Sequence, residues 1–237
     1  MEVRSTPLLQ RLLGGIMCLV ILSALQSASS HLRKRFPREM DVKQSELRNI
    51  PSLANVTVEQ LSTHLDAGDI TSTDLVRAYI SRIEEASEFN AVLQLNPDAL
   101  SVALALDQER REKGSRGPLH GIPILVKDNI ATKDKLDVSA GSYVLLGAKP
   151  VVESSVVSNL RAAGALILGK TNLSEWGNFR GLNVSAGWSP RGGQTLGAYY
   201  PNSTPEGSSS GSAVAIALGL SAAAIGTEVT PYSISLV

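Results

Sequence analysis

The segment Pro205–Thr227, PEGSSSGSAVAIALGLSAAAIGT, decides the fold. It begins with turn-forming residues and three consecutive serines, Ser208–Ser210, and continues into a run without charged or polar side chains, Ala213–Leu220. A short run that is apolar on every side predicts a helix buried all round, and Ala222–Ile225 predicts a short buried strand. The free N–H groups at the start of such a helix point at the serine loop, where they suit a carboxylate, a phosphate or an oxyanion.

Two other interpretations of this segment stay open at this point. A Ser/Gly linker followed by an ordinary core helix fits the composition, although linkers are seldom followed at once by a wholly apolar segment. A phosphate-binding loop fits less well, because the Gly-Lys-Ser/Thr ending of a P-loop is absent.

Helical and strand patterns alternate along the chain from Thr57 onward. Thr57-Val-Glu-Gln60 has the spacing of a helix capping box, and Gly68 is a helix stop. Apolar periodicity predicts further helices over 71–87, 97–113 and 155–163, and strands over 91–95, 122–126 and 165–168. This order predicts an α/β fold in which helices pack on a largely buried sheet.

Lys127 is the most informative charged residue. It directly follows Ile122–Val126, a run that is apolar at every position, so we expect it at the carboxyl end of a buried strand. Ligands bind at that end of the strands in open α/β sheets, although a lysine that simply caps a strand at the surface fits the same pattern. Lys170 and Lys133 lack a comparable apolar lead-in, and we expect both to be solvated.

A lysine at such a position can act as a general base if it is neutral. Its ordinary pKa is near 10.4, and desolvation at a buried strand end lowers the pKa of an amine by several units. The usual partner of a nucleophilic serine is a histidine. Of the three histidines, His31 borders the N-terminal apolar segment, His64 lies on an amphipathic helix and His120 has no nucleophile nearby in the sequence.

Three motifs in this order resemble the amidase signature family, in particular its secreted, fungal-type members. GSSSGSA, followed by an apolar helix and GTE, is similar to the family hallmark G-S-S-G-G-S-A…G-T-[DE]-x-x-G-S. Gly117–Asn129, GPLHGIPILVKDN, and Gly164–Trp176, GALILGKTNLSEW, are also typical of the family. The resemblance covers Val56 to Glu228. It implies a mixed β-sheet covered by helices on both faces, with the C-terminal half of the fold missing.

The resemblance also implies residue roles for the hydrolysis of a small-molecule amide by a Ser-Ser-Lys triad, without a cofactor or a metal. Lys127 is the general base, and Ser208 is the serine that bridges the lysine and the nucleophile. Backbone N–H groups in the segment Gly226, Thr227 and Glu228 bind the oxyanion and the substrate. Ser209 has no assigned role, and Ser210 stands where the family usually has glycine.

One departure puts the activity in doubt. The family nucleophile falls four residues after the acidic residue, and this chain has Tyr232 there, with Ser233 one place late as a weak substitute. Two hypotheses therefore compete. The first is an amidase whose recorded chain is incomplete, and the second is a non-catalytic remnant or binding protein that retains the lysine and serine-loop motifs.

The N-terminal residues predict export. Arg4 and Arg11 precede an apolar stretch, Leu12–Leu25, and the small residues Ser27–Ser29 suit cleavage. Fourteen apolar residues are fewer than the roughly 20 that a membrane span needs, which favours a cleaved signal over a retained anchor. We therefore divide the chain into a signal peptide (1–29), a pro-segment or linker (30–52), the N-terminal half of an amidase signature domain (53–228) and a tail outside the family (229–237).

Composition agrees with a secreted glycoprotein. The only cysteine, Cys18, lies within the predicted signal peptide, so the mature chain has no disulfide. Sequons predict glycosylation at Asn55, Asn183 and Asn202, whereas the sequon at Asn172 overlaps a family motif and carries little weight. The 22 basic and 22 acidic residues balance, so no nucleic-acid partner is expected. We also expect no stable membrane association after signal cleavage.

Overall fold

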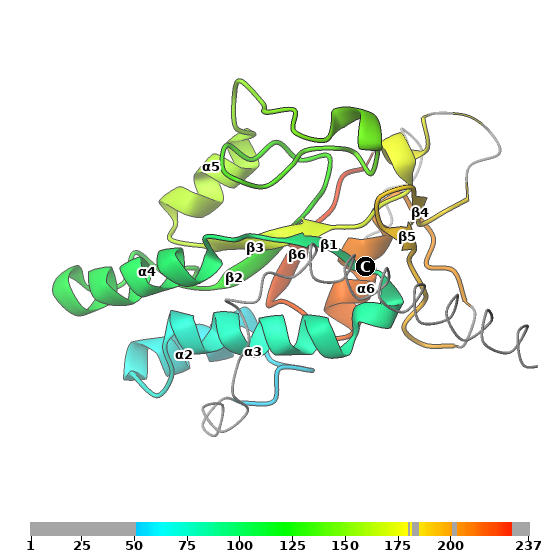
Figure 1. The fold of residues 1–237 in the computed structure, drawn as a ribbon. Helices are drawn as coiled ribbons and strands as arrows, with labels where there is room; N and C mark the ends of the chain where they lie inside the picture. The colour runs from blue at the N-terminus through cyan, green and yellow to red at the C-terminus, as the bar shows by residue number, and fades with distance from the viewer. Residues whose placement is uncertain (1–50, 180, 182–184, 201–202, 229–237) are drawn as a thin grey trace, which may run out of the picture. The chain divides into compact units, whose positions relative to one another are not determined.

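A four-stranded mixed sheet forms the centre of the computed structural model, which describes residues 51–179, 181, 185–200 and 203–228 (Figure 1). The strands lie in the order β1-β3-β2-β6. Their bounds are Val92–Leu95 for β1, Pro123–Lys127 for β2, Leu166–Thr171 for β3 and Ala223–Ile225 for β6. The two central strands are buried at every position, which explains why each begins with a continuous apolar run, Pro123–Val126 in β2 and Leu166–Leu168 in β3, instead of an alternating one.

Three of the four strands run in the same direction. β2 is parallel to both β3 and β6, and β1 is antiparallel to β3 at the edge. In the register of the parallel pairs, Lys127 lies opposite Thr171 and Val126 lies opposite Ile225. The end of β2 therefore lies next to the ends of both neighbouring strands.

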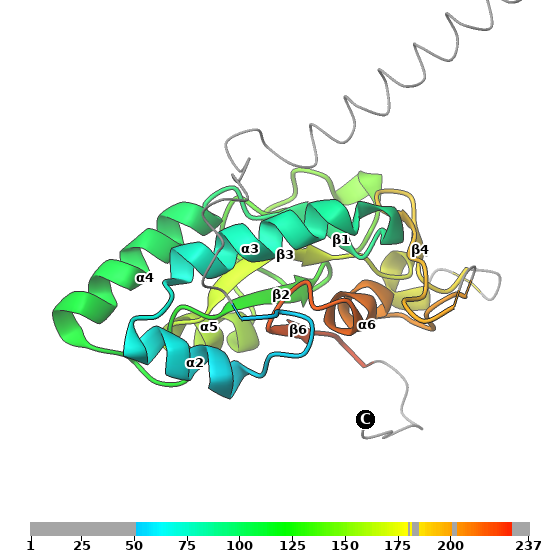
Figure 2. The ribbon, with the colours of Figure 1, turned by 90° about the horizontal axis from the view of Figure 1, so that it is seen from below.

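Helices cover both faces of this sheet, as predicted (Figures 1 and 2). α5 lies on one face, and α2, α3 and α6 lie on the other, while α4 packs against α3. The helices are α2 (Val58–Ala67), α3 (Ser72–Glu85), α4 (Ala99–Lys113), α5 (Ser155–Ala162) and α6 (Ser210–Ala217). On the α5 face the core consists of apolar side chains from β2, β3, α5 and the segment after β2, namely Val126, Ile130, Leu136, Val157 and Ile167.

The direction of the connections reverses at β2. α5 connects β2 to β3 on one face of the sheet, and α6 connects β3 to β6 on the other face. β3 and β6 thus lie on opposite sides of β2, and the helices that precede them lie on opposite faces of the sheet. Ligand sites in open α/β sheets lie outside the strand ends at such a reversal.

Short elements surround the end of the sheet. A two-stranded hairpin pairs Trp188–Ser189 (β4) with Gly193–Gln194 (β5). Three short 3-10 segments are η3 (Ser87–Phe89), η4 (Tyr143–Leu145) and η5 (Glu175–Asn178). The buried Asn172 side chain holds the hairpin, since it accepts a hydrogen bond from Ser189 Oγ and donates to the carbonyl oxygen of Gly193.

Helix starts follow the local sequence signals closely. Thr57 and Gln60 form both hydrogen bonds of a capping box at α2, and Gly68 ends that helix in the left-handed conformation, with φ of 76°. Thr71 and Asp74 form a second capping box at α3. These bonds satisfy N–H groups that the first turn of a helix leaves unpaired.

Three predictions about the sheet and α6 need correction. The strand predicted to be buried over Ala222–Ile225 spans Ala223–Ile225 and is only half-buried at each position, because it lies at the edge of the sheet. The third predicted strand does not end at Leu168 but continues to Thr171. The prediction that α6 is buried on all sides is wrong, because Ala213, Ile216 and Ala217 are exposed in the described structure. A helix that is apolar all round carries no pattern to tell which face is covered, so its sequence could not reveal the exposed face.

Several predicted features lie outside the described residues. These are the signal peptide, the pro-segment or linker up to residue 50, the tail over 229–237, and the sequons at Asn183 and Asn202. Asn55 is described and exposed, whereas Asn172 is fully buried. Among the described helices, none is long and apolar enough to cross a membrane.

Candidate active site

Lys127 lies at the carboxyl end of β2 and is fully buried. Its Nζ atom lies 2.6 Å from Ser208 Oγ, 2.9 Å from Ser209 Oγ and 2.8 Å from Thr227 Oγ1. The two serines precede α6, and Thr227 follows β6, so residues distant in sequence meet at one strand end. The structure thus brings together the predicted lysine, the predicted bridging serine and Thr227.

Ser209 closes the site by binding Thr227 through two hydrogen bonds. Its hydroxyl donates to the carbonyl oxygen of Thr227 at 3.1 Å and accepts from the Thr227 N–H at 3.1 Å. This gives Ser209, which had no predicted role, the role of a clamp between the serine loop and the end of β6. Because the Thr227 N–H already donates to Ser209, this hydrogen bond would have to break before the N–H could donate to an oxyanion.

The three hydroxyl groups around the Lys127 amine differ in their other hydrogen-bond partners. The proton of Ser209 goes to the Thr227 carbonyl oxygen, and Thr227 Oγ1 also accepts from Asn129 Nδ2 at 3.2 Å. Ser208 has the shortest distance to the amine, and no other side-chain partner for its hydroxyl exists among the described residues. Ser208 is therefore the hydroxyl best placed to exchange a proton with Lys127.

Burial makes that exchange possible near neutral pH. It lowers the pKa of Lys127 from 10.5 to about 8, against the opposing attraction of the Glu228 carboxylate. With a pKa of about 8, roughly a tenth of the lysine is neutral at pH 7, compared with less than about one part in a thousand at the ordinary value. The site therefore supplies a usable base.

The chain after β3 holds the serine loop, Ser208–Ser210, in place. The Ser174 N–H donates to the carbonyl oxygen of Ser208 at 3.1 Å. A side chain at Gly211 would place its Cβ 2.4 Å from the carbonyl oxygen of Ala91 and 2.5 Å from the backbone of Asn172, so only glycine fits there. The Ser210 hydroxyl donates to the carbonyl oxygen of Glu206 at 2.6 Å, which shows how a serine is accommodated where the family usually has glycine.

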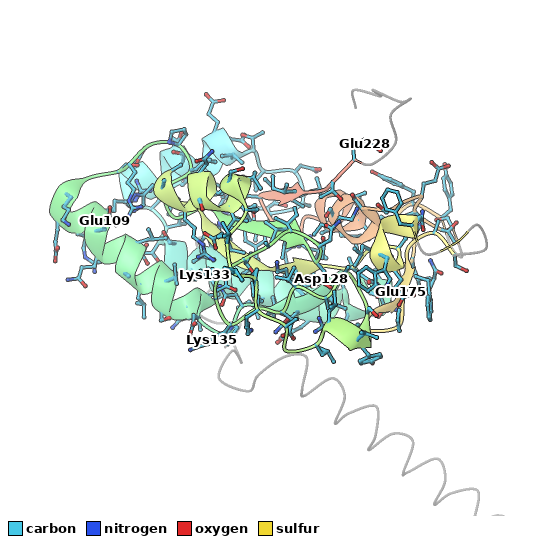
Figure 3. All side chains as sticks on the ribbon, turned by 90° about the horizontal axis from the view of Figure 1, so that it is seen from above. Glu109, Asp128, Lys133, Lys135, Glu175 and Glu228 are labelled. Carbon is cyan, nitrogen blue, oxygen red and sulfur yellow. The ribbon has the colours of Figure 1, made fainter. Side chains whose placement is uncertain are left out.

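The residue after the lysine, Asp128, organises the other side of the site. Its buried carboxylate accepts hydrogen bonds from the hydroxyl of Ser139 and from the Gly141 N–H, and Arg191 lies 3.9 Å away. Burial raises the pKa of Asp128 despite these partners. Figure 3 shows Asp128 among the side chains near the sheet, and Glu228 on the segment that follows β6. The sequence contained no pattern that would have singled out Asp128.

Lys170 is not solvated, and that prediction is wrong. The residue is fully buried because β3 runs three residues beyond the predicted apolar strand, and its Nζ donates to the carbonyl oxygen of Ile130 at 2.5 Å. Burial lowers the pKa of Lys170 to about 8, with Asp128 acting in the opposite direction. Lys133 is exposed, as predicted.

A cavity of about 890 Å³ opens beside the serine loop. Its polar lining includes the hydroxyl residues Ser203, Thr204, Ser208, Ser209 and Thr227, and Glu206 and Glu228 add two acidic side chains. Its apolar part comes mainly from two tyrosines and the exposed face of α6, namely Tyr199, Tyr200, Ala213, Ile216 and Ala217. A pocket with a mostly apolar wall and a few convergent polar groups is the usual form of a small-molecule site.

The remaining predicted residues are distant from this cluster or fall outside the description. His64 pairs with Asp69, and His120 contacts the carbonyl oxygen of Leu106 at 3.0 Å. His31, Tyr232 and Ser233 lie outside the described residues, so the predicted position of the nucleophile has no described geometry.

Comparisons with known proteins identify the family of this chain. A family model described as Amidase matches residues 74–231. A protein named "Putative amidase" from Arthroderma benhamiae is 43% identical over 209 residues, covering 79% of this chain and 35% of the relative. The structure of a peptide amidase from Stenotrophomonas maltophilia is 50% identical, with a TM-score of 0.72 over 75% of this chain and 37% of that one. An amidase family protein from Bacillus anthracis is 35% identical, with a TM-score of 0.71 over 86% of this chain and 40% of that one.

The chain therefore spans a little over a third of the length of these relatives. The match nevertheless includes the lysine strand, the serine loop and β6, which together form the described site. From the family match and the identities to these relatives, the chain belongs to the amidase signature family.

Proposed function

We propose that the described site is the proton-transfer half of an amide-hydrolysing Ser-Ser-Lys triad. The observation that carries this proposal is the 2.6 Å distance between Lys127 Nζ and Ser208 Oγ, at a lysine whose burial lowers its pKa to about 8. Neutral Lys127 takes the proton of Ser208, and Ser208 takes the proton of the attacking hydroxyl. The same path returns a proton to the departing amine nitrogen.

The proposal places a requirement on the segment after Glu228. In the family pattern a nucleophilic serine stands four residues after the acid, and the residue there is Tyr232. Pro231 has no N–H to contribute to an oxyanion hole, and a shift of about 1 Å in a reacting group already costs roughly a hundredfold in rate. We therefore propose that the chain with this segment hydrolyses amides poorly or not at all. The Thr227 N–H and its neighbours Gly226 and Glu228 contribute to oxyanion and substrate binding only in a form that has the serine.

We propose that the substrate is a small amide without a negative charge. The cavity beside Ser208 is mostly apolar, and its two charged lining residues, Glu206 and Glu228, are both acidic. One solved relative is a peptide amidase in complex with the competitive inhibitor chymostatin. For this chain we propose an amide with an apolar substituent.

Two measurements test the function. In the first, the transcript is sequenced across the codon of Glu228. A continuation that encodes a serine four residues after Glu228, directly preceded by glycine, supports an amidase. The Tyr232 codon in every transcript supports a non-catalytic protein. The 237-residue chain and any longer form are then assayed with a small aryl amide. Hydrolysis by the longer form should fall by at least about a hundredfold in Lys127→Ala and Ser208→Ala, because both changes interrupt the proton path. Near-normal turnover in either variant would contradict the assigned roles.

We also propose that the chain is exported and glycosylated at Asn55. The motivation is the N-terminal apolar stretch and the exposed position of Asn55. Mass spectrometry of protein from the culture medium of a eukaryotic host should show loss of the first 29 residues and a glycan at Asn55. An intact Met1, or protein recovered only with membranes, would contradict export.

A further inference from the structure

Ser208 meets the geometric requirements of a nucleophile in its own right. Its Oγ lies 2.6 Å from the Nζ of Lys127, within the distance at which a base removes a proton directly. Ser208 also lines the cavity, although the residue is only 8% exposed. A serine activated by a lysine, without a second serine, is a known variant of the nucleophile-and-base arrangement.

We propose that Ser208 and Lys127 form a Ser-Lys dyad that accepts an acyl group from small, uncharged, activated esters. This activity does not require a serine after Glu228, so it is independent of the amide hydrolysis proposed above. It is a property of the chain in its present form.

The neighbouring hydroxyls are less suitable as nucleophiles. The Ser209 hydroxyl donates its proton to the Thr227 carbonyl oxygen and accepts from the Thr227 N–H, so attack by Ser209 would break the clamp. Thr227 Oγ1 lies 2.8 Å from Lys127 Nζ and also accepts from Asn129. Of the two serines, only Ser208 can lose its proton to the lysine without giving up another hydrogen bond shown in the described structure, and its hydroxyl lies closer to the amine than that of Thr227.

The cavity selects the ester. Its apolar wall, formed by the two tyrosines and the exposed side chains of α6, suits an aryl or alkyl group. Glu206 and Glu228 lie on the same cavity, and its described lining includes no lysine or arginine to neutralise an anion. An ester that carries a carboxylate should therefore react more slowly than a neutral one.

The acyl transfer requires only Ser208, Lys127, the ester and water. Ser208 Oγ forms a bond to the ester carbonyl carbon, the bond from that carbon to the leaving oxygen breaks, and the Ser208 proton moves to Lys127 Nζ. An aryl oxide leaves as an anion, and the lysine then releases the proton to water. An amide differs because its nitrogen must be protonated in order to leave. Acylation by esters is thus compatible with poor amide hydrolysis.

The test uses p-nitrophenyl acetate and the full 237-residue chain. Release of p-nitrophenolate is followed over time, and peptide mapping by mass spectrometry locates the acetyl group. We expect rapid acetylation of the peptide that contains Ser208, removable by hydroxylamine because it is an ester, whereas acetyl groups on lysines are amides and remain. The rate should rise with pH around the pKa of Lys127, about 8, and the charged group that opposes the lowering of this pKa is the Glu228 carboxylate.

Three variants separate a dyad from background reaction. Ser208→Ala should lose the hydroxylamine-sensitive acetyl group, and Lys127→Met should slow its formation by at least about a hundredfold. Lys170→Met is the matched control, because Lys170 is equally buried, also has a pKa of about 8, and donates to a backbone carbonyl instead of a serine. It should retain the rate at Ser208.

Each other outcome counts against the dyad. An acetyl group on Ser209, labelling of lysines alone, or the absence of any Ser208 ester would overturn the inference. An equal loss of rate in Lys127→Met and Lys170→Met would do the same, because it would indicate a general effect of disturbing the core. Failure of this test leaves the amide proposal standing, since that proposal depends on a different nucleophile and is measured with an amide.

Discussion

The Ser209 hydroxyl forms two hydrogen bonds with the backbone of Thr227, one to its carbonyl oxygen and one from its N–H, both at 3.1 Å. Since 18 residues separate the two, this pair fixes the loop before α6 to the end of β6. The loop before α6 and the end of β6 together supply three hydroxyl groups within 3 Å of Lys127 Nζ, those of Ser208, Ser209 and Thr227. The geometry around the amine therefore depends on a side chain that does not itself need to react.

Replacing Ser209 with alanine should destabilise the protein. The change leaves the Thr227 N–H and carbonyl without their side-chain partner, and one such loss at a partly buried site costs about 1–3 kcal/mol. Urea unfolding measures the change. Ser101→Ala is the control, because Ser101 is exposed on α4, and its loss should change the free energy of unfolding by no more than about 0.5 kcal/mol. Equal stability of the two variants would show that the clamp contributes nothing.

The two buried lysines should make the protein more stable as pH rises from 8 to 10. The pKa of Lys127 and of Lys170 is about 8 in the folded chain and near 10.5 in the unfolded chain. Between these values the unfolded chain binds more protons, so the free energy of unfolding increases by up to about 1.4 kcal/mol per pH unit for each lysine. Above pH 10 Tyr79 acts in the opposite direction, because burial raises its pKa and the unfolded chain loses that proton first.

Urea unfolding at several pH values between 7.5 and 10 measures this slope. Lys127→Met and Lys170→Met should each remove about half of it. Lys133→Met is the control, since Lys133 is exposed and its replacement should leave the slope unchanged. A stability that is flat or falls over this range would mean that neither lysine has the lowered pKa.

Asp128→Asn should cost about 3–5 kcal/mol, although the two side chains have nearly the same shape. The carboxylate accepts from the Ser139 hydroxyl and the Gly141 N–H and lies near Arg191. Removing its charge leaves the partly buried cation of Arg191 with Asp137, 3.4 Å away, as its remaining carboxylate partner among the described residues, and breaking one partner of a buried ion pair has a cost of this size. Asp69→Asn, an exposed aspartate paired with His64, is the control and should cost less than about 1 kcal/mol. Similar unfolding free energies for the two variants would contradict the role of Asp128.

The sequence was most informative where a local rule determines the structure. The capping box at Thr57 involves residues three apart, so its spacing predicted the start of α2. The uninterrupted apolar run before Lys127 predicted the strand, and the position of the lysine at its end followed. The pairing of Lys127 with Ser208 came from the family motifs, because no local rule relates residues 81 positions apart.

What the sequence did not reveal depends on tertiary contacts. Lys170 is polar and follows a glycine, and only the continuation of β3 beside β2 buries it. The exposed face of α6 and the Asp128 network likewise depend on which segments pack against them. The clamp formed by Ser209 was missed because three consecutive serines are equivalent in sequence and differ only in where their hydroxyls point.

Gly211→Ala should disrupt both the fold and the site. The added Cβ would lie 2.4 Å from the carbonyl oxygen of Ala91 and 2.5 Å from the N and O atoms of Asn172, all backbone atoms that cannot rotate away. The first turn of α6 must therefore move, and Ser208 and Ser209 must move with it. Overpacking of this kind costs about 1–3 kcal/mol.

Two measurements check this prediction. Urea unfolding gives the loss of stability, and the pKa of Lys127, followed by NMR of the labelled lysine side chain, should return toward 10.5 as its surroundings loosen. Gly181→Ala is the matched control, because a Cβ at Gly181 meets no atom within 4 Å. If Gly211→Ala matches the control in stability and keeps the low pKa of Lys127, then the close approach of α6 to β1 and to the chain after β3 does not hold the serine loop in place.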